Sequence, residues 1–236
     1  MNKFCKTFLM IASLLATQSL WANNFSAQVF DLEADVQKDS PLYKVKHDET
    51  LTDEKLQFHN VYAYPDGKEA FTEDVVLKGT EVISYRVNQK QLVEEGSIEV
   101  KDNKVFFTYK KKDREAKTSE EKYVDNLVIG PSLVPYMQKH WDKLKAGETL
   151  SVRLAVPDRR ETVGFSLFKD KSSTDDKFIV KMKASSLVIS AIVDPLYFSF
   201  LPDGSRMVEM KGRTQAKKDK DGKFSDLDAH TIYKFE

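Results

Sequence analysis

Apolar and polar residues alternate along most of the chain with the period of two that is typical of strands with one buried face. Turn residues separate the alternating segments: Pro-Asp-Gly occurs at 65–67 and again at 202–204, and Asp102-Asn103 suits a two-residue hairpin turn. The pattern predicts a mainly β chain, with its clearest strands at 56–64, 83–87, 92–101, 105–109, 150–156, 163–167, 178–182, 196–201, 207–210 and 232–235.

One segment, 132–146, follows the helical period instead. Ser132 can cap its start and Gly147 follows its end as a stop signal. One face of this helix carries the apolar residues Leu133, Met137, Trp141 and Leu144. The predicted fold class is therefore mainly β: a curved antiparallel sheet, or a partly closed barrel that hides its strand edges, with one amphipathic helix packed on it.

The first 22 residues have the pattern of a secretory signal peptide. Lys3 and Lys6 precede an apolar run at 8–16, which is too short to span a bilayer, and Ala22 offers a small residue at the cleavage point. We expect an exported, periplasmic product with a single β-rich domain at 23–236. The alternative is that residues 7–21 stay attached as an anchor.

The net charge and the cysteine content exclude further classes of function. Basic and acidic residues number 37 each, and the two lysines of the predicted leader are offset by no acid there, so the processed chain has a net charge of −2. Such a chain lacks the basic surplus that nucleic acid attracts. The one cysteine, Cys5, lies in the leader and leaves the processed chain without disulfide or thiol chemistry. Two segments are rich in mixed charge. Residues 110–122 are predicted to form a solvated loop or long strand ends, and residues 215–226 a mobile loop.

No catalytic or metal-binding motif stands out. The four histidines are far apart in the sequence, whereas zinc sites favour closely spaced ligand pairs. A Gly-x-Ser-x-Gly nucleophile elbow and glycine-rich phosphate loops are both lacking from the sequence. We therefore predict no catalytic residue, no metal and no cofactor.

The apolar stretch 187–201 admits three interpretations: the wall of a lipid-sized cavity, a lip that dips into a membrane surface, or an ordinary core segment. On the first interpretation the candidate pocket residues are Leu187, Val188, Ile189, Ile192, Leu196, Tyr197, Phe198 and Phe200, together with Trp141. Arginines could bind a charged head group at the rim of such a pocket or pair with neighbouring acids. These rim candidates are Arg153, Arg159, Arg160 and Arg206.

Two segments carry a resemblance: Val193-Asp194-Pro195-Leu196-Tyr197-Phe198 through Gly204-Ser205-Arg206, and Gly130-Pro131 through Trp141 with Leu144-Lys145-Ala146-Gly147-Glu148. In their layout, residues 75–213 resemble bacterial periplasmic β-rich families of unknown function whose fold is similar to the half-barrels of lipoprotein carriers. The resemblance implies a hydrophobic ligand inside a curved sheet. It carries over no individual ligand residue.

The leading functional hypothesis is an exported, non-catalytic envelope protein that holds a lipid or other amphiphile, or a protein partner. The first alternative is a structural or interaction module with a filled core. The second is a hydrolase that acts on envelope material, which would need a cleft where a histidine or carboxylate meets a partner group.

Overall fold

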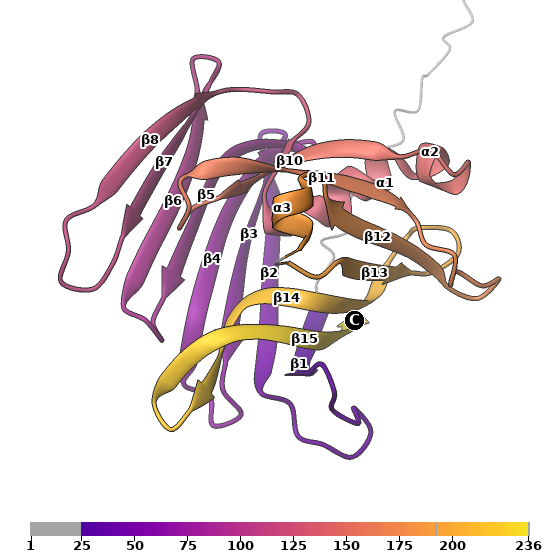
Figure 1. Ribbon diagram of the computed structural model, residues 1–236, viewed down its shortest axis with the longest axis horizontal. Helices are drawn as coiled ribbons and strands as arrows, with labels where there is room; N and C mark the ends of the chain where they lie inside the picture. Colours follow the sequence, from indigo (N-terminus) through magenta and orange to yellow (C-terminus); the bar gives the residue numbers. More distant parts are fainter. Residues whose placement is uncertain (1–24, 192, 236) are drawn as a thin grey trace, which may run out of the picture.

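The computed structural model describes residues 25–191 and 193–235, so the predicted signal peptide lies outside the described residues. Within them one sheet of fifteen strands runs in the order β8-β7-β6-β5-β4-β3-β2-β1-β15-β14-β13-β12-β11-β10-β9 (Figure 1). The strands are β1 (Phe25–Asp31), β2 (Tyr43–Thr52), β3 (Lys55–Ala63), β4 (Glu69–Lys78), β5 (Glu81–Gln89), β6 (Glu94–Lys101), β7 (Lys104–Lys110), β8 (Lys117–Lys122), β9 (Leu127–Val128), β10 (Leu150–Val156), β11 (Glu161–Lys169), β12 (Phe178–Ala184), β13 (Leu196–Phe200), β14 (Met207–Lys220) and β15 (Lys223–Phe235).

The predicted fold class is confirmed: the protein is mainly β, with one large, curved, open sheet. Neighbouring strands pair antiparallel, except for the parallel pair β9 and β10. The last strand joins the two halves of the sheet, because Phe235 pairs with Phe25 of β1 while the other side of β15 pairs with β14. The Asp102-Asn103 turn also forms as predicted, with φ of 51° and 59°.

The sheet rolls so that its two ends meet without closing into a barrel. Glu121 of β8 accepts hydrogen bonds from the backbone and the hydroxyl of Thr162 at 3.0 and 2.6 Å, and Ser119 Oγ donates to the carbonyl of Arg160 at 2.5 Å. These are side-chain bonds in place of a backbone ladder. In addition, β9 lies against β5, which buries the far end of the sheet inside the roll.

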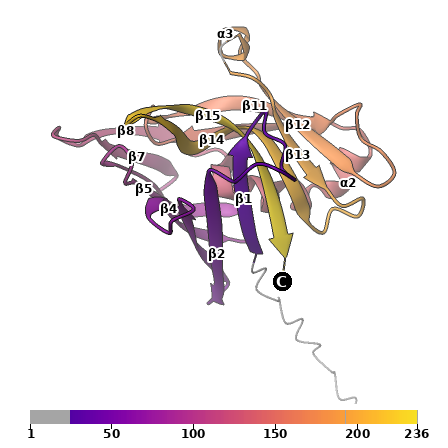
Figure 2. The same ribbon diagram turned by 90° about the horizontal axis from the view of Figure 1, so that it is seen from below.

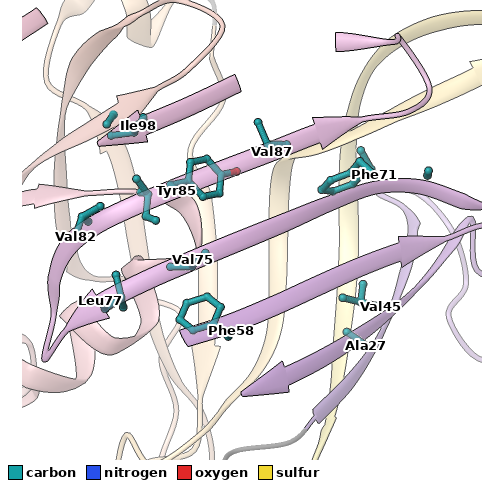
Figure 3. Packing of buried hydrophobic residues seen from close by; sticks show 14 of the residues in the cluster. Ala27, Val45, Phe58, Phe71, Val75, Leu77, Val82, Tyr85, Val87 and Ile98 are labelled. Carbon is teal, nitrogen blue, oxygen red and sulfur yellow. The ribbon is translucent and has the colours of Figure 1, made fainter. Parts of the chain in front are cut away.

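Two hydrophobic cores fill the interior. The first lies on the inner face of β1–β7 and includes Phe58, Phe71 and Tyr85, which Figure 3 shows on neighbouring strands. The second lies between the helices and β10–β13. Strand β10 touches both, since Ala155 packs in the first core and Val152, from the opposite face of the same strand, packs in the second.

The predicted helix 132–146 is two shorter helices, α1 (Leu133–Lys139) and α2 (Trp141–Lys145). His140 interrupts the helix with φ −108° and ψ 23°. Ser132 does not cap α1 with its side chain; its hydroxyl instead contacts the backbone of Ile129, within a 3-10 turn at Gly130–Ser132. The apolar face is as predicted, because Leu133, Met137 and Leu144 are buried and Trp141 packs against the same core. A third helix, α3 (Leu187–Ser190), joins β12 to β13.

The predicted loop at 215–226 is partly wrong. Residues 215–226 form the far end of the long β14–β15 hairpin, whose turn is at Asp221-Gly222. Ala216 and Leu227 turn inward from it to the first core, and the backbone of Gln215 and Lys217 accepts hydrogen bonds from Gln89 and Tyr43. Residues 110–122 end in β8, which agrees with the strand alternative, and the charged residues of β8 suit an edge strand.

Gly96 of β6 lies close to the β10–β11 turn. An added Cβ there would lie 2.7 Å from Cβ of Pro157, which begins the β10–β11 turn, and 3.1 Å from the Tyr109 ring. We therefore expect Gly96→Ala to lower the free energy of unfolding by about 1–3 kcal/mol through overpacking. Gly164→Ala is the control, because its nearest neighbour is 3.4 Å away at the end of the Arg153 side chain. Urea unfolding would measure both, and equal stability of the two variants would contradict the tight overlap.

Candidate functional site

The helix α3 projects from the outer face of the sheet (Figure 2). It carries the most exposed large apolar side chains of the described residues. Leu187 is 87% exposed and Val188 72% exposed, more than any other large apolar side chain among the described residues. Ile189, next in sequence, is half-buried and packs on the second core. Adjacent bulky apolar side chains at a protruding point are uncommon on a protein surface, so α3 is the candidate contact site.

Local sequence explains why the chain bulges here. The ladder between β11 and β12 ends at Ala184, and Ser185 makes one further backbone bond to Gly164 at 2.9 Å. A single helical turn follows, in which the amide of Ser190 donates to Ser186 at 2.9 Å and that of Ala191 to Leu187 at 3.2 Å. Pro195 then precedes β13, and proline cannot continue a helix. The turn is thus confined to a short, projecting crossover.

A hollow lies beside α3 and opens broadly to solvent. It mixes apolar side chains with hydroxyls and one cation, and none of its lining residues is acidic. The lining comprises Thr149, Ser166, Phe168, Lys183, Ala184, Ser185, Leu187 and Ser190. A second open depression lies around Val82, Val100 and Tyr123. The interior of the roll, in contrast, is occupied by buried side chains.

The predicted pocket residues therefore divide among several environments. Leu187 and Val188 point to solvent, Ile189 and Leu196 are half-buried against the second core, and Phe198 and Phe200 are buried within it. Tyr197 lies on the outer face under Lys181, whose Nζ is 5.0 Å from its ring centre, and Trp141 lies under Gly204. Ile192 is outside the described residues. The structure does not gather these side chains around one cavity, and their role in ligand binding stays a prediction.

The four predicted rim arginines do not form one cluster either. Arg153 donates to the hydroxyl and carbonyl of Thr162, and Arg159 pairs with Glu161 at 2.7 Å. Arg160 takes φ 56° in the β10–β11 turn. Arg206 lies 5.1 Å from the ring centre of Phe235. At least three of the four thus have their own local contacts, and a head-group site built from them also stays a prediction.

A buried polar ladder crosses the inner face of β2–β5 and escaped the sequence-based prediction. His47 Nδ1 lies 2.7 Å from Asn60 Oδ1, Asn60 donates to Glu73 at 3.1 Å, and Tyr85 donates to the other oxygen of Glu73 at 2.7 Å. Burial raises the pKa of Glu73, and the bonds from Tyr85 and Asn60 offset only part of that effect. A signal was present, because alternation places His47, Asn60 and Glu73 on the apolar faces of their strands.

This ladder has the chemistry of a structural element rather than that of a cleft. Phe25 stacks on the His47 ring with centres 4.2 Å apart and covers its outer side. All three ladder residues on β2–β4 are buried. Within the described residues, no group of three or more histidine, cysteine, aspartate or glutamate side chains is placed to hold a metal ion.

A second charged group surrounds Glu209 on the outer face of β14 and β15. Two lysines contact the Glu209 carboxylate, Lys177 at 2.8 Å and Lys211 at 3.2 Å. His230 Nε2 lies 2.5 Å from Glu209 Oε1 without hydrogen-bond geometry. Burial alone would raise the pKa of Glu209, but the hydrogen bond and charge of Lys177 together with Lys211 bring it down to about 2. Burial and the charge of Lys211 lower the pKa of His230.

The Glu209 group predicts acid sensitivity. A carboxyl whose folded pKa is depressed contributes stability above pH 4.5 that is lost as the pH falls toward 2. We expect the native protein to lose roughly 1–3 kcal/mol more than Glu209→Gln over that interval, after allowance for the half-exposed lysines. Denaturant melts of both proteins at pH 6, 4 and 2.5 would measure the difference. Parallel pH profiles for the two would contradict it.

Fold and site together define a mainly β protein with an open, rolled sheet. Helices α1 and α2 pack on the second core, and the exposed residues Leu187 and Val188 of α3, here called the α3 tip, lie outside the sheet. No family model matches the chain, and no curated protein matches it. A solved structure from Brucella abortus, described as a beta-barrel-like protein of domain of unknown function DUF1849, is similar with 12% identity and a TM-score of 0.44 over 91% of this chain and 98% of that chain. The expected likeness to β-rich bacterial families of unknown function and to lipoprotein carriers stays a prediction.

In the part of the chain that the structure describes, no helix has the length and apolar character needed to cross a bilayer.

Proposed function

We propose that the protein is an exported, non-catalytic component of the cell envelope that works by pressing the α3 tip against an apolar surface. The observation that carries the proposal is the exposure of Leu187 and Val188 at a point that projects from the sheet. The filled interior supports surface contact over internal cargo, because both cores are packed with large side chains such as Phe71, Phe107 and Phe200. Export rests on the leader pattern of the first 22 residues.

The direct test places an environment-sensitive fluorophore on the tip. In a Cys5→Ser background, Val188→Cys supplies a single labelling position, and Val93→Cys supplies a matched control on the β5–β6 turn, where Val93 is 60% exposed. Mixed with the envelope fraction of the producing cells, the label at 188 is expected to shift its emission to the blue and the label at 93 to stay unchanged. Unchanged emission at both positions, or equal shifts, would contradict the proposal.

Replacing the two exposed residues of the α3 tip should weaken binding without changing the stability of the fold. Leu187→Ser with Val188→Ser removes most of the exposed apolar area of α3, so we expect at least ~10-fold weaker retention on the envelope fraction. The melting temperature should be unchanged, because neither side chain is buried in the fold. Leu51→Ser with Val93→Ser is the matched control, since these residues are 50% and 60% exposed elsewhere on the surface. Weaker retention of the control as well would show a general surface effect instead of a specific tip.

A further inference from the structure

We infer that the surface met by α3 is an anionic lipid bilayer, into whose head-group layer the tip inserts. This inference rests on the proposed function and names its partner. Its first support is the composition of the crossover: the ten residues 184–193 carry no charged side chain, in a chain in which 31% of residues are charged. Segments that enter the boundary between head groups and acyl chains carry few charged side chains, because burying an unpaired charge in an apolar medium is costly.

The second support is the shape of the tip. Leu187 and Val188 stand outward on α3, while Ile189 packs back on the second core and holds the helix to the sheet. Figure 2 shows α3 raised well clear of the neighbouring strands. A small, convex apolar point offers a folded protein little area for contact, whereas a fluid bilayer deforms around it.

The third support is the charge around the base of the tip. Lys183 is exposed and lines the hollow beside Leu187, together with the hydroxyls of Ser185 and Ser190. No acid lines this hollow, and the carboxylate that ends the uncharged run, Asp194, acts on Arg213, whose pKa it helps to raise. An ammonium group and hydroxyls set just behind an apolar point match the order of a bilayer surface, in which phosphates lie outside the acyl chains.

Flotation with vesicles of phosphatidylglycerol and phosphatidylcholine at 3:7, or of phosphatidylcholine alone, tests the inference on the purified protein. We expect the unaltered chain to float with the anionic vesicles. Leu187→Ser with Val188→Ser should lower the partition coefficient about tenfold on both vesicles. Lys183→Ser should lower it about fivefold on the anionic vesicles alone. The Leu51→Ser, Val93→Ser control should float like the unaltered chain.

Absence of flotation, or equal flotation by the tip variant and its control, would overturn the lipid assignment. The fluorophore at position 188 keeps this failure distinct from failure of the proposed function. If its emission shifts with envelope proteins freed of lipid but not with pure vesicles, the tip contacts a protein and only the lipid assignment falls. If it shifts with neither, the proposed function falls too.

Discussion

Trp141→Ala is expected to lower the free energy of unfolding by about 3–5 kcal/mol, because it empties a large site between α2 and the sheet. The indole packs against Phe178 and Phe200, with ring centres 4.6 and 5.2 Å away. Its Nε1 is buried with no hydrogen-bond partner among the described residues, so its contribution comes from packing. Trp141→Phe should therefore keep most of the stability. Thermal and urea unfolding would measure both, and a loss below 1 kcal/mol for Trp141→Ala would show that α2 is not anchored by this side chain.

The other wall of the Trp141 site gives an independent check. Gly204 has φ +76°, and a Cβ added there would lie 2.3 Å from the indole ring, so Gly204→Ala combines backbone strain with a clash. Gly222 has nearly the same φ, +77°, but open space around it. Gly222→Ala consequently reports the backbone strain alone. The excess loss at Gly204 measures how firmly Trp141 is held, and its absence would place the indole elsewhere.

Asn60→Leu is expected to cost about 2–4 kcal/mol at pH 8, since it breaks the buried ladder at its centre. Leucine is close to asparagine in size, but it donates nothing to Glu73 and accepts nothing from His47. The charge of Glu73 then loses one of its two buried donors and retains only Tyr85. Urea unfolding at pH 5 and pH 8 would measure the loss.

The pH dependence of this loss follows from the raised pKa of Glu73. A carboxyl with a raised folded pKa contributes stability that is present at low pH and declines as the pH rises through that pKa. The cost of Asn60→Leu should thus be smaller at pH 5, where Glu73 is more easily protonated. Glu73→Gln is the matched control, which keeps the shape without the charge and should flatten the dependence. A cost for Asn60→Leu that is equal at both pH values would contradict a buried, titrating Glu73.

Much of the sheet could be predicted from the alternation of side chains, because a period of two in polarity is specific to strands with one buried face. Two features could not. The helix break at His140 depends on how α1 and α2 each fit the second core, a tertiary effect without a local breaker such as proline or glycine. The β14–β15 hairpin extends to 220 and 223 on few inward contacts, one of them from Ala216, which a polar composition conceals.

The candidate site was harder to predict than the fold. An apolar run such as 187–201 has the same composition whether it lines a core or projects from it, so only the fold distinguishes Leu187 at the surface from Phe198 in the core. The interpretation as a lip that dips into a membrane was available from the sequence beside the pocket interpretation, and nothing local separated the two. The ladder was visible in principle, because Asn60 interrupts an otherwise apolar face.

The most direct test of a filled interior and a working tip is native mass spectrometry of the protein purified without detergent, beside its Leu187→Ser, Val188→Ser variant. We predict that the variant has the bare mass of residues 23–236. Any lipid that adds mass to the unaltered chain should be absent from the variant, because that lipid is bound through the α3 tip. An amphiphile that stays bound one-to-one in both proteins would contradict this prediction, because such a ligand would have to lie inside the rolled sheet, where large side chains now pack.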